Sequence, residues 1–462
     1  MEPIDIAKAS KEAFEASQAV RHNERVDALS KIKDALRHNK ATILEANKLD
    51  VQAAAEEVNA GRLSAPLLKR LDLTRSDKWD SMLQGISDVA ALPDPNGKVS
   101  YASELDDGLR LHRVSCPIGV LLVIFESRPE VVVNIAALAI KSGNAAILKG
   151  GKESLKTTTA LSDAIRSALS QTSLDKNYIQ TVHSRGEISS LLELDKYIDL
   201  VIPRGSNALV SSIQQNSRIP VMGHADGLCT VFLDATANKE KAIRVVLDSK
   251  IDYPAACNAA EILLLHTDLP KEIWTSVATA LLSHGVQLRC DAPSLALLAS
   301  DPSVASLPTF STHVLEANPS SDFTTEFLDT ILAVHTTPSL SSAVSFINSH
   351  SSHHTDSIVT ESESSASIFC RTVDSAGTFV NASTRFADGF RYGFGTEVGI
   401  STGRIHARGP VGLEGLVIYK YVLRSEGSAG HIVSEFGVGE GKRAFKHAPL
   451  GSDSIPAGFD IV

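Results

Sequence analysis

Among the five cysteines, Cys257 has the surroundings that best suit nucleophilic chemistry. Small residues flank it on both sides, Pro254 fixes a turn just upstream, and a predicted strand begins a few residues later. Backbone N–H groups in such a loop can lower the pKa of a thiol and bind an oxyanion. A free cysteine is, however, more often a small buried side chain, so both interpretations stay open from this residue alone.

Polar and glycine residues follow three predicted strands, at the point where each strand ends. Open parallel sheets bind ligands at the carboxyl ends of their strands, and glycine-rich turns at helix N-termini bind phosphates. The three turns together therefore predict a dinucleotide site. Its candidate residues are Glu126, Lys149, Gly150, Gly151, Gly205 and Ser206.

Three further segments are rich in residues that bind ligands. The run 393–399 is similar to a dinucleotide fingerprint, but it lies late and follows an irregular stretch, so we interpret it as a loop that shapes a pocket. The segment 381–410 is dense in Gly, Arg, Ser and Thr, which suits carboxylate or phosphate recognition. The His-rich run 349–354 lacks the cysteine or carboxylate spacing of a metal site, so we predict a solvated loop and no metal.

The composition restricts the class of protein. The length of 462 residues predicts two or three domains, and the formal net charge of −10 argues against nucleic acid as the main partner. The N-terminus lacks the apolar core of a signal peptide, and no stretch approaches the ~18 apolar residues of a membrane span. Scattered cysteines indicate neither a disulfide framework nor a zinc site, so we expect a cytoplasmic protein.

Periodicity predicts the elements that position these residues. Residues 4–60 carry apolar positions at helical spacing, and residues 98–114 alternate as in a β-hairpin. The continuous apolar strand 119–125 opens an alternation of strands and helices that predicts a doubly wound, parallel α/β domain. A second α/β unit follows. We expect a cofactor-binding domain over 1–235, a catalytic domain over 236–425 and a C-terminal extension over 426–462.

Motifs distributed along the chain resemble the gamma-glutamyl phosphate reductase family of the aldehyde dehydrogenase superfamily. They occur in order from about residue 5 to 425, which makes the resemblance specific. The matching stretches are Pro117–Val120, Glu126–Pro129, Lys141–Asn144, Lys149–Gly151, Ile202–Ser206, Cys257–Glu261, Val380–Phe386, Gly393–Thr402 and His406–Glu414.

The resemblance implies an aldehyde dehydrogenase-like fold with a small oligomerisation hairpin near 98–114. It implies that NADPH reduces L-glutamyl 5-phosphate to L-glutamate 5-semialdehyde with release of phosphate, the second step of proline biosynthesis. The reaction would proceed through a thioester on Cys257, with Ser127 and Asn258 beside it, and Glu326 would orient the nicotinamide ribose. The implied substrate-side residues are Asn381, Arg385, Ser401, Thr402, His406 and Arg408. A homo-oligomer and docking with glutamate 5-kinase are further expectations.

Two departures from the superfamily pattern bear on the reaction. The stretch 221–227 contains no glutamate, whereas hydrolytic aldehyde dehydrogenases have a glutamate general base there. Its absence suits a reductase, whose thioester is not hydrolysed. The turn 126–128 lacks the oxyanion-hole asparagine, so Ser127 and the backbone N–H of Cys257 are the candidate donors. Two alternatives stay open: an NAD-dependent aldehyde oxidiser, and a non-catalytic scaffold that keeps the fold.

Overall fold

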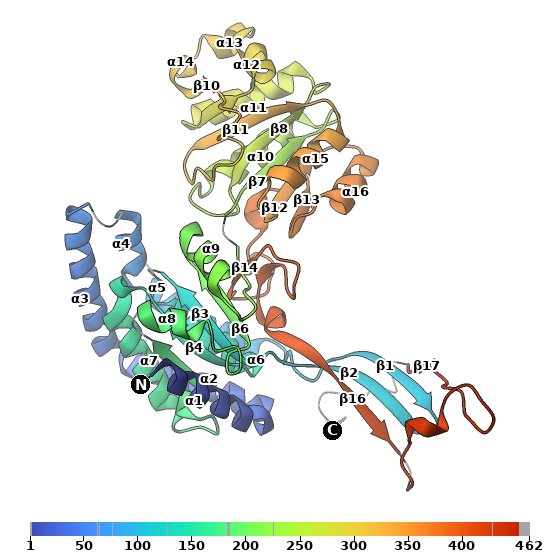
Figure 1. Cartoon of the computed structure of the whole chain (residues 1–462). Helices are drawn as coiled ribbons and strands as arrows, with labels where there is room; N and C mark the ends of the chain where they lie inside the picture. Colours follow the sequence, from blue (N-terminus) through green and yellow to red (C-terminus); the bar gives the residue numbers. More distant parts are fainter. Residues whose placement is uncertain are drawn as a thin grey trace.

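The computed structural model describes residues 2–451 except 62, 64, 76, 127, 183–184, 225 and 427. The chain forms three parts, each built on one β-sheet (Figure 1). We name two of them by the number of strands in their parallel sheets, the four-stranded part and the seven-stranded part. The third, which is an antiparallel sheet, we call the arm. In Figure 1 the seven-stranded part lies above the four-stranded part, and the arm extends away from both toward the lower right. Among the described residues, no helix is long and apolar enough to cross a membrane.

The four-stranded sheet has the order β5-β4-β3-β6 with parallel pairings throughout. All six residues of β3 are buried, as its continuous apolar run predicts. The buried helix α6 ends at Gly143, whose φ of 78° is left-handed and favours glycine. The elements of this part are α1 (Pro3–Ala16), η1 (Ser17–Ala19), α2 (His22–His38), α3 (Lys40–Asn59), α4 (Ala65–Leu71), α5 (Lys78–Ala91), β3 (Val120–Phe125), α6 (Val131–Ser142), β4 (Ala145–Lys149), η2 (Lys152–Ser154), α7 (Leu155–Leu169), η3 (Lys176–Tyr178), β5 (Ile179–Val182), α8 (Arg185–Leu191), β6 (Leu200–Arg204) and α9 (Asn207–Asn216).

The seven-stranded sheet has the order β10-β9-β11-β8-β7-β12-β13, and all its pairings are parallel. Successive residues of β7 serve opposite faces: Val231 and Leu233 join one apolar cluster and Phe232 joins another. Helices therefore cover both faces. The elements are β7 (Cys229–Leu233), α10 (Lys239–Ile251), β8 (Ala260–His266), α11 (Lys271–Ser283), β9 (Gln287–Cys290), α12 (Ala292–Ala299), α13 (Pro302–Ala305), α14 (Phe310–His313), β10 (Val314–Glu316), β11 (Ile331–Thr337), α15 (Leu340–His350), β12 (Thr355–Val359), α16 (Glu363–Thr372) and β13 (Gly377–Val380).

The arm is an antiparallel sheet of order β16-β2-β1-β17. The pairing of β1 (Val99–Asp106) with β2 (Leu109–Pro117) confirms the hairpin predicted near 98–114. β16 (Val417–Ser425) forms an open edge, and the short β17 (Ala448–Pro449) pairs with β1. The turn η6 (Val433–Glu435) lies between these last two strands in sequence.

The structure divides the chain differently from the predicted ranges 1–235 and 236–425. β7 lies within the first range, but it pairs with β8 and β12 in the seven-stranded sheet. After β13 the chain returns to the four-stranded part through η4 (Thr384–Phe386), β14 (Gly399–Ser401), β15 (Gly409–Val411) and η5 (Leu413–Leu416). Val398, Val411, Leu413 and Leu416 join the apolar core of that part. Domain ranges that follow the order of the sequence cannot describe this return, because apolar side chains far apart in sequence pack into one core.

Candidate active site

A cavity of about 1200 Å³ lies at the carboxyl ends of β3, β4 and β6. The strand order reverses between β3 and β6, which is where open α/β sheets bind ligands. Helices α3 and α9 supply the other walls. Of the predicted cofactor residues, Glu126, Lys149, Gly151 and Ser206 line the cavity. Gly150 and Gly205 are their neighbours in sequence, so the structure brings the three predicted turns together.

The turn after β6 leaves little room for a side chain. A Cβ atom on Gly205 would lie 2.6 Å from a carboxylate oxygen of Glu126, and that carboxylate accepts a hydrogen bond of 3.1 Å from the Ser206 N–H. Ser206 is the N-cap of α9, and its side chain makes no capping hydrogen bond. The first N–H groups of α9 therefore remain available to an anion, with the positive end of the helix dipole behind them.

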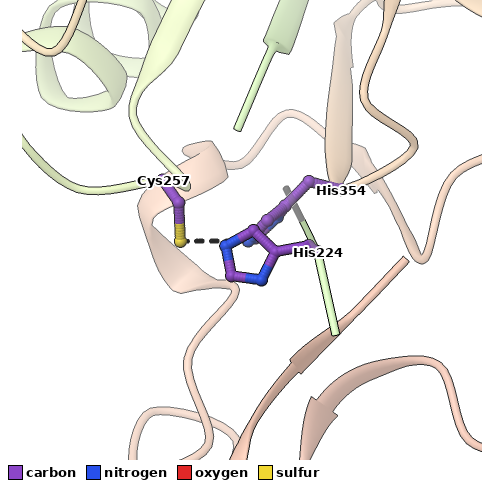
Figure 2. A group of neighbouring side chains, drawn as sticks. All are labelled: His224, Cys257 and His354. Carbon is purple, nitrogen blue, oxygen red and sulfur yellow. Dashed lines mark hydrogen bonds between the residues drawn. The ribbon is translucent and has the colours of Figure 1, made fainter. Parts of the chain in front are cut away.

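A second group of functional side chains lies at the amino edge of the seven-stranded sheet. Cys257 precedes β8, His224 precedes β7 and His354 precedes β12, and these three strands are neighbours in the sheet. Figure 2 shows both imidazoles beside the sulfur. The Cys257 Sγ lies 3.4 Å from the His354 Nε2. One ligand atom of each of the three residues lies within 4.8 Å of the others.

Cys257 is half-buried, and its surroundings hold the thiol in the protonated form. Burial is the main reason that its pKa rises to about 12, and the carboxylates of Glu326 and Glu397 raise it further. Arg204 and Arg128 lower the same pKa, because their positive charges favour the thiolate. The nucleophile therefore needs a proton acceptor within reach.

His354 places a neutral imidazole within reach of the thiol. The residue is 1% exposed, and burial together with the neighbouring His224 lowers its pKa to about 3, so its ring is neutral. Its Nδ1 lies 2.9 Å from the Thr355 Oγ1, while its Nε2 faces the thiol. The prediction that 349–354 is a solvated loop is therefore wrong for most of the run: Ser349 and His350 end α15, and Ser351 and His354 are buried.

His224 and Glu326 connect the stretch 221–227 to the site. The Nδ1 of His224 donates to the Ile400 carbonyl at 3.3 Å in the tautomer that this acceptor requires, which leaves Nε2 unprotonated. Glu326 accepts a hydrogen bond of 2.9 Å from the Gly227 N–H. A Cβ on Gly227 would lie 2.0 Å from the Cys257 carbonyl oxygen, so a side chain there would displace the cysteine loop.

Three of the predicted site residues make hydrogen bonds within the protein: Asn258, Arg385 and Asn381. The buried Asn258 donates to the Ala387 carbonyl at 2.9 Å and accepts from the Arg385 guanidinium. Arg385 also donates to Asp252 at 3.0 Å. Asn381 donates to the Thr360 carbonyl at 2.9 Å. The contacts of Asn258 and Arg385 link the cysteine loop to Ala387 and Asp252, whereas that of Asn381 reaches the residue after β12. A substrate-side role of Asn381 and Arg385 stays a prediction.

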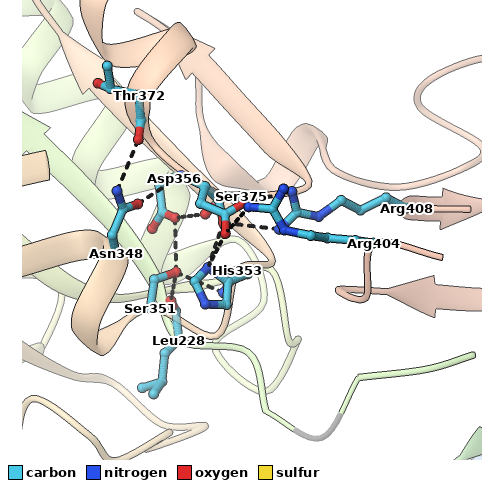
Figure 3. Close-up of polar contacts among 10 residues, drawn as sticks. Leu228, Asn348, Ser351, His353, Asp356, Thr372, Ser375, Arg404 and Arg408 are labelled. Carbon is cyan, nitrogen blue, oxygen red and sulfur yellow. Dashed lines mark hydrogen bonds and ion pairs between the residues drawn. The ribbon is translucent and has the colours of Figure 1, made fainter. Parts of the chain in front are cut away.

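The other predicted substrate-side residues lie on the returning segment. His406 contacts the Gly415 carbonyl at 2.8 Å, and Arg408 and Arg404 pair with Asp374 at 2.9 and 2.7 Å. Figure 3 shows the two arginines reaching the loop before β13. The Ser401 Oγ is buried without a hydrogen-bond partner among the described residues, and Thr402 is partly exposed. Ser127 lies outside the described residues.

Sequence reasoning missed His354, His224 and the charged pair Arg128 and Arg204 as site residues. One signal was present: His354, like Cys257, comes shortly before a predicted strand. The adjacency of β7, β8 and β12 is not readable from that pattern, because β12 follows β8 by almost 90 residues.

The chain is similar to known proteins over most of its length. The profile of the Aldehyde dehydrogenase family matches residues 3–294. The "probable gamma-glutamyl phosphate reductase" of Schizosaccharomyces pombe is 53% identical, covering 97% of each chain. The gamma-glutamyl phosphate reductase of Saccharomyces cerevisiae is 48% identical, covering 96% of this chain and 97% of the yeast protein.

A solved structure extends the likeness to three dimensions. The crystal structure of gamma-glutamyl phosphate reductase from Thermotoga maritima has a TM-score of 0.86 and 36% identity, covering 93% of this chain and 100% of that one. The expected aldehyde dehydrogenase-like α/β fold is thus confirmed. The chain belongs to the aldehyde dehydrogenase family and, within it, to the gamma-glutamyl phosphate reductases.

Proposed function

We propose that this enzyme uses NADPH to reduce L-glutamyl 5-phosphate to L-glutamate 5-semialdehyde, releasing phosphate, through a thioester on Cys257. This is the second step of proline biosynthesis. The observation that carries the proposal is the Cys257 Sγ at 3.4 Å from a neutral His354, because it places the nucleophile beside a ring that can take its proton while the sulfur attacks.

The cavity at the carboxyl edge of the four-stranded sheet fits a dinucleotide. Gly151 and the N-terminus of α9 allow phosphates to approach the backbone, and Lys149 and Lys152 offer positive charge for a 2′-phosphate. When bound, NADPH supplies the hydride that reduces the acyl group on Cys257. Glu326, held by the Gly227 N–H, is the residue that we assign to the nicotinamide ribose.

The chain's own residues move the proton and accommodate the phosphate. His354 takes the thiol proton, and the sulfur forms a bond to the acyl carbon as the bond from that carbon to the phosphate oxygen breaks. The phosphate that leaves takes one proton from solvent. Arg128 and Arg204 balance the charge of the phosphate that leaves. After hydride addition, the alkoxide expels the thiolate as the aldehyde forms, and the thiolate regains its proton from His354.

The oxyanion needs donors that are fixed before the reaction. We assign this role to Ser127 and to the backbone N–H of Cys257, as the sequence predicts. Each such donor contributes about 3 kcal/mol in comparable sites. The stretch 221–227 provides His224 and Asp226 but no glutamate, and the Asp226 carboxylate accepts a hydrogen bond from the Asn207 amide, so no glutamate there activates water against the thioester. This difference favours reduction over hydrolysis.

The reverse assay tests the proposal. NADP⁺ reduction by L-glutamate 5-semialdehyde should depend on inorganic phosphate, and Cys257→Ala should lose at least about 10⁴-fold in turnover while binding NADPH normally. Oxidation that proceeds without phosphate would instead identify an aldehyde oxidiser. Activity retained by Cys257→Ala would overturn the thioester.

The arm supports a proposal about assembly. The edge strand β16 exposes Tyr419, Tyr421 and Leu423, and an open edge can pair with another chain. We assign this edge to a homo-oligomer, to be measured by sedimentation with Tyr421→Lys as the variant. A cytoplasmic location and docking with glutamate 5-kinase stay predictions.

A further inference from the structure

We propose that Cys257, His224 and His354 form a zinc-binding site, and that a bound Zn²⁺ ion reversibly blocks the nucleophile. One thiol and two imidazoles converge there, with one ligand atom from each within 4.8 Å of the others (Figure 2). This donor set favours a zinc-like ion over Mg²⁺ or Ca²⁺, which prefer oxygen ligands. The blocking role rests on the proposed function of Cys257, whereas the binding does not.

The distances suit tetrahedral coordination. Zn–S bonds of about 2.3 Å and Zn–N bonds of about 2.0 Å place sulfur and nitrogen about 3.5 Å apart around one ion. The Cys257 Sγ and the His354 Nε2 are 3.4 Å apart. The His224 ring meets the His354 ring edge-on, with 5.5 Å between ring centroids. One ligand atom of each residue lies within 4.8 Å of the others, so a three-ligand site requires the His224 ring to move toward the ion when it binds.

Hydrogen bonds to the outer ring nitrogens hold both imidazoles. His224 uses Nδ1 for the Ile400 carbonyl, and His354 has Nδ1 beside the Thr355 hydroxyl. Each ring therefore directs Nε2 toward the sulfur, in the arrangement by which protein metal sites orient histidine ligands. The three residues precede neighbouring strands of one sheet, so their backbones are fixed before any ion binds.

The binding step balances without an oxidant or reductant. Zn²⁺ binds the Cys257 sulfur as thiolate, and one proton leaves to solvent. Cys257 is half-buried, so a water molecule can occupy the fourth position. A zinc-bound thiolate is a weaker nucleophile than a free one, and the ion takes up space beside the sulfur that the acyl phosphate must approach. Zinc and substrate should therefore compete.

Zinc affinity of the full chain, stripped of metal and free of substrate, tests the site directly. Competition with a chromophoric chelator should give one Zn²⁺ per chain, and Cys257→Ala, His224→Gln and His354→Gln should each weaken binding by at least about 100-fold. Two matched controls should bind normally: Cys370→Ser, which removes the exposed thiol, and His350→Gln, whose ring stacks on Phe346 away from the site.

A protection experiment on the unmodified chain keeps the test independent of variant folding. With Zn²⁺ present, iodoacetamide should alkylate Cys370 at an unchanged rate and Cys257 at least 10 times more slowly, as read by mass spectrometry, and a chelator should restore the rate. Equal zinc affinity in Cys257→Ala, or unprotected Cys257 at saturating zinc, would overturn the site. Reductase activity that zinc leaves unaffected, despite protection, would overturn only the block. Loss of the proposed function would leave zinc binding intact.

Discussion

The two parallel sheets use opposite edges for their functional residues. In the four-stranded sheet the cavity lies at the carboxyl edge, where Glu126 and Ser206 follow β3 and β6. In the seven-stranded sheet, Cys257 and His354 lie at the amino edge, before β8 and β12. The carboxyl edge of that second sheet carries a structural carboxylate, Asp291, after β9.

The difference has a local cause. A carboxyl-edge site uses helix N-termini that each βα turn supplies by itself, so its residues are contiguous in sequence. An amino-edge site uses connections from helix to strand, which have no such N–H groups, so its chemistry depends on side chains brought together by strand order. The carboxyl edge thus suits phosphate binding and the amino edge suits a thiol–imidazole pair.

After the loss of Cys257 itself, the largest expected effect is at the amino edge, in His354→Gln. Losing the proton acceptor of Cys257 should lower turnover by about 10²–10⁴-fold while NADPH affinity stays unchanged. Steady-state kinetics and cofactor titration measure the two quantities, with His350→Gln as the control. Turnover within about threefold of the unmodified enzyme would show that the 3.4 Å contact has no role in proton transfer.

Asp291 tests whether the carboxyl edge of the seven-stranded sheet has a structural role. Against the opposing effect of burial, hydrogen bonds from His335, Ser294 and the Thr336 backbone lower its pKa from 3.8 to about 2. An acid whose folded pKa lies below its unfolded value stabilises the fold above about pH 4 and loses that contribution as pH falls toward 2.

Asp291→Asn should therefore unfold about 2 kcal/mol more easily at pH 7, with the gap closing as pH falls below 4. Denaturant titrations between pH 7 and 3 measure the gap. Turnover per folded molecule should be unchanged. A variant of normal stability but impaired turnover would place function at this edge as well.

Arg385 separates structural support from substrate binding. Arg385→Met removes the partner of Asp252 and of the buried Asn258, so unfolding should become about 2 kcal/mol easier. Turnover should fall with it, because Asn258 adjoins Cys257, whereas the KM for the acyl phosphate should stay within about threefold. A raised KM at normal stability would instead support the substrate-side prediction from the sequence.

The smallest effect is expected at the carboxyl edge of the four-stranded sheet. Gly205→Ala places a Cβ 2.6 Å from the Glu126 carboxylate and should weaken NADPH binding by about 10-fold through a displaced turn. The alkylation rate of Cys257 should not change, because Arg204, which favours the thiolate, lies in β6 and not in the displaced turn. A change in that rate would mean that the turn after β6 also shapes the amino-edge site.

Residues defined by their own local segment were predicted best. β3, the hairpin and the three turns of the cavity follow from apolar runs, alternation and glycine placement, all of which act over a few residues. The domain ranges differ from the structure because β7 and the segment after β13 each pack against residues distant in sequence. His354 was missed for the same reason.

The sequence by itself determined the kind of elements and the chemistry available: an apolar sheet, phosphate-binding turns and a thiol among small residues. Tertiary structure decided which groups meet. The order β8-β7-β12 places a buried neutral imidazole 3.4 Å from the Cys257 sulfur, and the contacts of Arg385 make it a support for the cysteine loop. Periodicity encodes which face of an element is buried, whereas neighbours across a sheet are selected by packing of the whole core.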